Sequence, residues 1–172
     1  MTTTDVTTQL CVQHLSSTGT SQTGPHGQPT MSLHTGRHCP SQVTTKLIAM
    51  PPGHQSGAHL HQDHEVQLLV LCGAAITLYG PALTPLFHTP GDVVHIPPGV
   101  IHAGLNLSRH PRETVYGYEV LTDPADQDII PLPELDERIQ QIDAELRTCH
   151  SDYAALHGPM NAIPPRGTDH AQ

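Results

Sequence analysis

The chain contains no tryptophan and few other aromatic residues, which limits the core that it can build. Among its 172 residues there are one Phe and four Tyr, so aromatic residues make up 3% of the sequence. Aromatic side chains bury the largest apolar areas, and a chain without them forms a small core for its length. The length fits one domain, and we expect part of the chain to lie outside it.

Basic residues are also scarce. Seven Lys and Arg stand against 16 Asp and Glu, which gives a formal net charge of -9. Binding to a phosphate backbone or to an anionic membrane surface needs clustered cations, so we expect neither a nucleic-acid nor a membrane partner. No segment approaches the roughly 18 consecutive apolar residues of a membrane helix. The first residues, MTTTDVTTQLCVQHL, lack the basic and apolar regions of a signal peptide.

The four cysteines show no pattern of a disulfide framework or a zinc knuckle. They are Cys11, Cys39, Cys72 and Cys149, and no two of them form a Cys-x-x-Cys pair. Free thiols are typical of a reducing compartment. We therefore expect a cytoplasmic protein.

The residue composition changes along the length of the sequence, and these changes predict its organisation into segments. Residues 1–40 are rich in Thr, Ser, Gly and Pro, which is typical of a mostly flexible arm. Residues 41–130 contain short β-branched and apolar runs separated by Gly, Pro and Asp. This pattern predicts an all-β sandwich or barrel. A C-terminal helix is expected within 131–160, followed by a tail at 161–172.

Residues that are typical of helix ends flank the C-terminal segment. Pro133 stands at its start and Gly158 directly after its end. The apolar residues between them repeat at intervals of four and three, which predicts a narrow apolar stripe along one side of a helix. They are Leu135, Ile139, Ile142, Leu146, Cys149, Tyr153 and Leu156. Such a stripe packs either on its own barrel or against a second subunit, and we expect a homodimer.

Histidine is the residue type that is over-represented, with 15 copies. Four of them fall within GHQSGAHLHQDHE at 53–65. His59 and His61 are two residues apart, so on an extended chain both point to one face, and Glu65 shares their parity. A second segment, GDVVHIPPGVIHAGLN, brings His102 on another strand. Two histidines and a carboxylate form a facial site that suits Fe(II), and also Mn, Ni, Co or Zn.

These two segments resemble the two conserved motifs of the cupins. The first motif has a glycine, a His-x-His pair, a glutamate and a second glycine. The second has a glycine, a Pro-x-Gly turn, a histidine and an asparagine. The matching residues are Gly53, His59, His61, Glu65 and Gly73 for the first motif, and Gly91, Pro97, Gly99, His102 and Asn106 for the second. The resemblance implies a double-stranded β-helix, the small jelly-roll barrel of the cupins.

The first motif departs from the family pattern at one position. Seven residues, and not six, separate Glu65 from Gly73. Counted back from Gly73, the position of the carboxylate falls on Val66, which cannot bind a metal. Either a β-bulge absorbs one residue and Glu65 is the ligand, or His64 or Gln67 takes its place, or the site holds histidines only.

The resemblance implies one divalent metal ion per chain and a small-molecule substrate. Fe(II) would make the protein a dioxygenase-type oxidoreductase. Zn or Mn in the same place would give a non-redox isomerase, lyase or bond-forming enzyme, and Ni is a further possible metal. A sensor that binds a metal or a small ligand without turnover is the third alternative. His95 and Tyr118 are candidate catalytic residues. The alternatives are a hydrogen-bonded strand residue for His95 and a packing residue for Tyr118.

Overall fold

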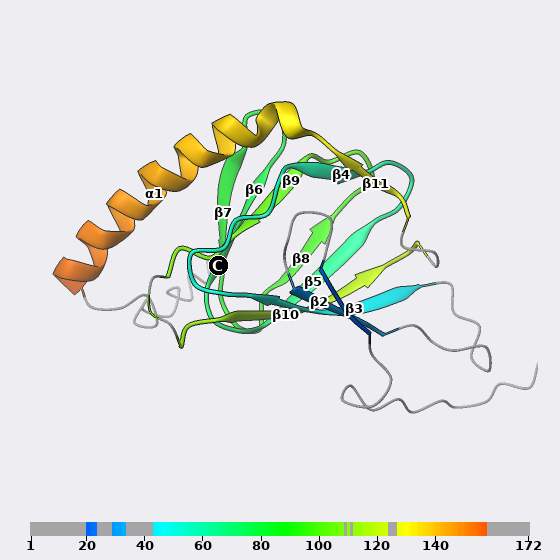
Figure 1. The fold of residues 1–172 in the computed structure, drawn as a ribbon, viewed down its shortest axis with the longest axis horizontal. Coiled ribbons are helices and arrows are strands. Elements are labelled where there is room, and N and C mark those ends of the chain that lie inside the picture. The colour runs from blue at the N-terminus through cyan, green and yellow to red at the C-terminus, as the bar shows by residue number, and fades with distance from the viewer. Residues whose placement is uncertain are drawn as a thin grey trace, which may run out of the picture.

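The computed structural model describes residues 20–23, 29–33, 43–108, 110, 112–123 and 127–157. Two antiparallel sheets, one of six strands and one of five, lie face to face. One helix runs over the outer side of the five-stranded sheet (Figure 1). We call the space between the two sheets the barrel interior. The all-β fold with a C-terminal helix that the sequence predicts is confirmed.

Sheet A is the six-stranded sheet. Its strands, in spatial order, are β1 (Thr20–Thr23), β2 (Pro29–Leu33), β3 (Thr44–Met50), β10 (Val115–Leu121), β5 (Val66–Cys72) and β8 (Val93–Ile96). β-branched and apolar residues make up most of β5, β8 and β10, in keeping with their place in a half-buried sheet.

Sheet B is the five-stranded sheet. Its order is β11 (Ile129–Pro131), β4 (His59–His61), β9 (His102–Leu105), β6 (Ala75–Tyr79) and β7 (Thr84–His88). Each neighbouring pair is antiparallel. Sheet B therefore brings β4 and β9, which carry the histidines of the two motifs, next to each other.

The alternation of side chains fixes which residues face the barrel interior. Met50 of β3 and Val115 of β10 pack with Ala75 of sheet B, so they point inward. Because successive strand residues point to opposite faces, every second residue from these positions is also inward. The opposite face of sheet B packs on the helix, where Ile76 and Leu105 join the core cluster that contains Ile139.

The helix begins with a 3₁₀ turn, η1 (Pro133–Leu135), and continues as α1 (Asp136–His157). Ile139 and Ile142 are buried against sheet B, and Leu135 and Leu146 pack beside them, so the first part of the stripe covers the chain's own barrel. Arg147 reinforces this contact, because its guanidinium donates to the carbonyl oxygens of Leu107 and Asn106 at 3.1 and 3.2 Å. Cys149, further along the stripe, is exposed.

Two strands fall within the segment predicted as a mostly flexible arm. β1 and β2 pair with each other, and β2 pairs with β3 from Thr30 opposite Ile48 to Leu33 opposite Thr45. A composition rich in Thr, Ser and Pro does not preclude this pairing, since backbone hydrogen bonds to an edge strand need no apolar side chains. The rest of the arm and the tail at 161–172 lie outside the described residues, and the domain boundaries stay a prediction.

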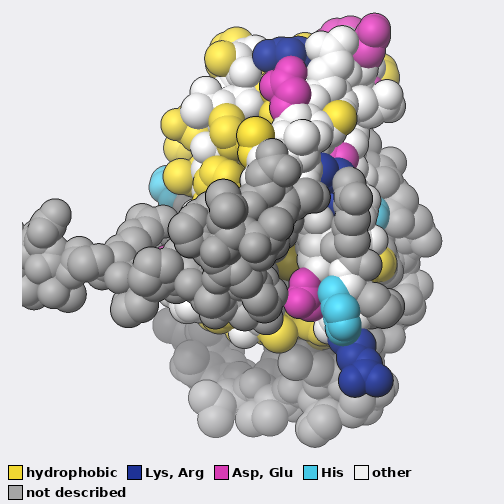
Figure 2. Space-filling model, turned by 90° about the vertical axis from the view of Figure 1, so that its left-hand side faces the viewer, with side chains coloured by type: hydrophobic (Ala, Val, Ile, Leu, Met, Phe, Trp, Pro, Cys, Tyr) yellow, Lys and Arg dark blue, Asp and Glu magenta, His cyan; other side chains and the backbone are white. Residues whose placement is uncertain are grey.

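The described surface exposes several large apolar side chains. They are Leu71, Tyr79, Leu86, Phe87, Val93, Tyr116 and Ile130. Figure 2 shows hydrophobic side chains gathered on one face of the molecule, beside charged side chains of both signs. Within the described residues, no helix has the length and apolar composition needed to cross a membrane.

Candidate metal centre

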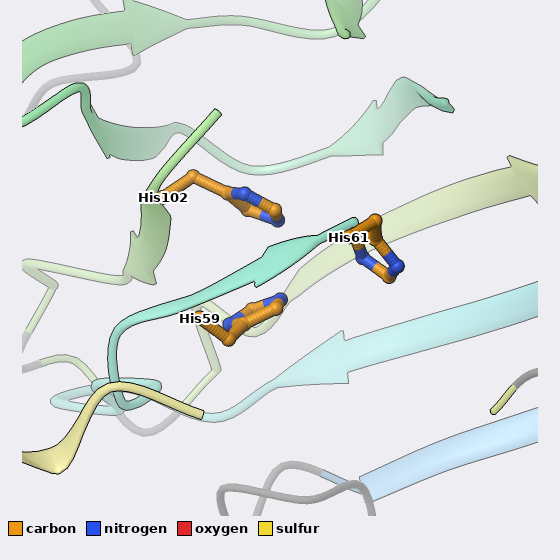
Figure 3. A group of neighbouring side chains, drawn as sticks. All are labelled: His59, His61 and His102. Carbon is orange, nitrogen blue, oxygen red and sulfur yellow. The ribbon is translucent and has the colours of Figure 1, made fainter. Parts of the chain in front are cut away.

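Three histidines from the two motifs meet in one group. His59 and His61 lie on β4, and His102 lies on β9 directly opposite His59 (Figure 3). One ring nitrogen of each lies within 4.8 Å of the corresponding nitrogens of the other two. His61 and His102 are buried, and His59 is partly buried. This spacing matches three ligands that share one metal ion.

Backbone carbonyl groups orient two of the three rings. The Nδ1 of His102 lies 2.9 Å from the carbonyl oxygen of Val100, and the Nδ1 of His59 lies 3.2 Å from that of Gly57. A carbonyl oxygen can only accept, so Nδ1 carries the proton in both rings. The lone pair of each neutral ring is then on Nε2, which is how metal-binding histidines are commonly held.

The turn before His102 and the asparagine after it fix the second motif in place. Gly99 has a φ of 73°, a conformation that glycine adopts without strain, and its N–H donates to the carbonyl oxygen of His61 at 2.6 Å. Asn106 is buried, and its amide donates to the carbonyl oxygens of Met50 and Glu113 at 3.0 and 2.9 Å. The Pro-x-Gly turn and the asparagine thus have structural roles that position the histidines.

Glu65, the predicted fourth ligand, is not brought to the three histidines. Val66 is fully buried and packs with Val94 and Leu121 in the barrel interior. Glu65 therefore points to the outer face of sheet A, where its carboxylate accepts a hydrogen bond from Nε2 of His95 at 2.9 Å. The extra residue before Gly73 places valine where the family pattern has the carboxylate. The β5–β10 ladder does shift its register between Val70 and Cys72, but this irregularity leaves Glu65 on the outer face of sheet A.

The other candidates also lie away from the group. His95 and Tyr118, predicted as catalytic, alternate with inward residues of β8 and β10 and so lie on the outer face of sheet A. Their predicted role therefore lacks support, because the sheet backbone separates them from the histidines. Gln67 is exposed, and Nδ1 of His64 donates to Asp128 at 2.8 Å. Of the alternatives left open by the sequence, the group of histidines only is the one that the structure assembles.

Solved structures with the same architecture come from several bacteria. The chain matches a cupin-like protein from Thermotoga maritima with a TM-score of 0.54 and 17% identity, over 73% of this chain and 93% of that one. It matches a protein with a double-stranded β-helix domain from Klebsiella pneumoniae with a TM-score of 0.52 and 17% identity, over 72% and 97%. A Cupin 2 conserved barrel domain protein from Salinispora arenicola gives 0.51 and 18%, over 78% and 98%.

The chain has a cupin fold. No protein-family model matches the sequence, and no curated protein matches it. Identities below 20% establish shared architecture, and they leave the chemistry to the residues of this chain.

The three histidines fit a transition-metal ion. They supply neutral nitrogen donors, which suit Fe, Zn, Ni and Cu better than Mg or Ca. Carbonyl groups that bind Nδ1 set the tautomer for two of them before any metal arrives. The chain is therefore a metal-binding candidate with an all-histidine site, and the identity of the metal stays a prediction.

A hydrogen-bonded carboxylate, that of Asp128, lies against the turn that follows β4. The backbone N–H of Asp63 donates to Asp128 at 2.7 Å, and this bond lowers the pKa of the Asp128 carboxyl group; His64 adds a weaker contribution of the same sign. At the other end of the barrel, burial lowers the pKa of His54. The turn that follows β4 is thus held by an ionised carboxylate.

The sequence analysis did not identify two charged residues that point into the interior. Lys46 and Glu119 lie on β3 and β10 and share the parity of the inward residues Met50 and Val115. Lys46, Ile48 and Met50 fall on one face of the predicted strand TTKLIAM. This shared parity was the signal that could have placed Lys46 in the interior.

Proposed function

We propose that the protein is a divalent-metal-dependent enzyme that acts on a small molecule, with one Fe(II) per chain and dioxygenase-type chemistry. The observation that carries this proposal is the group of three ring nitrogens within 4.8 Å of one another in the barrel. Three ligands from one side leave about three positions of a six-coordinate ion for substrate and dioxygen. Bound Fe(II) supplies the redox chemistry with dioxygen at those positions.

The protein's own residues hold the ligands and exclude water. The carbonyl oxygens of Val100 and Gly57 keep two imidazoles in the tautomer that binds metal. Val66, Val94 and Leu121 form an apolar cluster in the interior. An apolar surround of this kind strengthens electrostatic interactions between the site and a bound substrate, because it keeps bulk water out.

A non-redox metal enzyme is the second candidate, and the same donor set is compatible with it. Catalytic zinc sites also use three histidines with an open fourth position. With Zn or Mn in this group, the metal acts as a Lewis acid for an isomerase, a lyase or a bond-forming enzyme. A sensor that binds metal without turnover is the remaining alternative.

Metal analysis followed by oxygen uptake tests the proposal. Protein purified without chelator is expected to contain about one metal ion per chain. After anaerobic loading with Fe(II), a panel of small organic acids, amines and diols should include at least one that drives oxygen uptake. A His59/His61/His102 triple Ala variant is the control. Equal metal content in both proteins would place the site elsewhere, and turnover with Zn or Mn but not Fe(II) would favour the second candidate.

A further inference from the structure

A charged pair lies inside the barrel, on the sheet that faces the histidines. Lys46 and Glu119 are direct partners in the β3–β10 ladder, and the Lys46 Nζ lies 3.8 Å from Oε2 of Glu119. Their side chains are 8% and 16% exposed. The residues of the same parity on these strands and on β5 include Ile48, Leu68 and Leu121, so the pair interrupts an apolar surface.

Counting residues along the strands relates the position of the pair to that of the three histidines. A Cβ added to Gly104 of β9 would lie 3.3 Å from Sδ of Met50, so these two residues mark one layer. Asn106 bonds to the Met50 carbonyl, which places that layer towards one end of the barrel. On β3, Lys46 precedes Met50 by four residues and so lies four residues further from that end.

The histidines follow the same progression on sheet B. On β9, His102 lies two residues further from that end than Gly104. His59 on β4 is the ladder partner of His102, and His61 lies two residues further still. With a rise of about 3.3 Å per residue, Lys46 and His61 are both ~13 Å from the shared layer. The backbone positions of Lys46 and His61 are therefore at a similar distance from the shared layer, on two sheets that face each other.

Stability alone does not call for this pair. Removing two charges from water costs free energy that their mutual attraction seldom exceeds, and apolar side chains of similar volume stabilise a core as well or better.

The charges of the site favour an anionic ligand. Three neutral imidazoles leave the full charge of a divalent ion uncompensated, because Val66 stands where a carboxylate ligand would reduce it. The opposite charges of Lys46 and Glu119 cancel each other. A barrel loaded with metal therefore has a net positive interior with a low dielectric constant, in which an anion is strongly stabilised.

We propose that Lys46 is the specificity residue of this site and binds the carboxylate of a small organic acid, whose other end takes an open position on the metal held by the three histidines. Glu119 is a positioning residue that holds the ammonium group inside the barrel. The substrate class is then a small carboxylate, and this assignment rests on the proposed metal-dependent function.

Binding calorimetry of the full chain loaded with Zn²⁺ tests the proposal without requiring turnover. The probes are malonate, succinate and glutarate, each compared with its half-amide, which retains one carboxylate for the metal. At least one dicarboxylate should bind wild type tighter than its half-amide. Lys46→Met keeps the length of the side chain, and it should weaken that dicarboxylate at least tenfold and the half-amide less than threefold. Lys46→Arg should restore most of the affinity.

Glu119 is tested through its dependence on Lys46. Glu119→Gln should change dicarboxylate affinity at least threefold in wild type and not in the Lys46→Met background, which is the signature of coupled residues. The double variant removes both charges together and keeps the test valid if Lys46→Met alone fails to fold.

The outcomes separate the two proposals. Failure of wild type to bind Zn²⁺ would overturn the proposed metal-dependent function. Normal Zn²⁺ binding, together with dicarboxylate affinity that does not depend on Lys46 or with no dicarboxylate binding, would overturn this inference alone.

Discussion

His59 and His102 lie directly opposite each other on β4 and β9, with their ring centroids 4.2 Å apart. Directly opposed side chains of antiparallel strands have Cβ atoms about 5 Å apart, so the sheet itself brings the two rings together. His61 adds a third ring whose centroid is 5.5 Å from that of His102. The strand ladder thus assembles the group before a metal binds.

His61→Ala should remove most of the bound metal, because His61 is buried and supplies one of only three nitrogen donors in the group. Loss of one ligand of three leaves two, and we expect metal affinity to fall at least a hundredfold. The measurement is metal content by elemental analysis after dialysis. His95→Ala is the matched control, since this histidine is exposed on the outer face. Equal losses in the two variants would contradict the assignment.

Glu65→Gln should leave metal content within about twofold of wild type, since the Glu65 carboxylate bonds to His95 on the outer face of sheet A. The two side chains are 41% and 53% exposed, so their pairing contributes well under about 1 kcal/mol to the free energy of unfolding. Metal titration and urea unfolding are the measurements. A large loss of metal would restore Glu65 as a ligand and would require the start of β5 to rearrange.

Ile139→Ala should destabilise the fold by about 2–5 kcal/mol, since its side chain is fully buried between the helix and sheet B. Gln140→Ala on the exposed side of the same helix should change the free energy of unfolding by less than about 0.5 kcal/mol. Urea unfolding measures both. Similar values for the two variants would mean that the helix does not dock on the barrel in solution.

Asp128 makes stability depend on pH in the acidic range. The N–H of Asp63 holds the pKa of this carboxyl group below its ordinary value in the folded chain. The unfolded chain therefore takes up the proton first, and the stabilisation is full above the unfolded pKa, near pH 4. It is lost as the pH falls through the lower, folded value.

Asp128→Asn should accordingly lose stability less steeply than wild type between about pH 4 and pH 2. The measurement is thermal unfolding at a series of pH values. Asp143→Asn, which breaks the pair with Arg147 on the helix, is a comparison variant at a distant carboxylate. Parallel pH profiles of Asp128→Asn and wild type would contradict the role of Asp128.

A homodimer stays a prediction, and the outer face of sheet A is where we expect it to form. Leu71, Val93 and Tyr116 are exposed there on three adjacent strands. Burying such side chains stabilises an interface by ~1.5–3 kcal/mol each. Val93→Glu should therefore convert a dimer into a monomer, as measured by light scattering, whereas Gln140→Glu on the helix should not. A wild-type monomer would remove the prediction.

The sequence by itself predicted the fold and three histidines that the structure brings together. Short strands between Gly, Pro and Asp predicted the barrel, and helix punctuation at Pro133 predicted α1. Motif spacing identified His59, His61 and His102, because a fixed rise and a period of two along strands translate spacing directly into position. The sequence did not predict β1 and β2, because their segment is rich in Thr and Ser. β1 pairs with β2, and β2 pairs with β3.

Only the tertiary structure decided which face each remaining residue takes. One extra residue before Gly73 turns Glu65 outward and Val66 inward, and strand parity likewise sends His95 and Tyr118 outward. Lys46 and Glu119 are 73 residues apart in sequence and become neighbours only through the β3–β10 ladder. Register between distant strands is set by the packing of the whole sandwich, and a shift of one residue exchanges interior for surface.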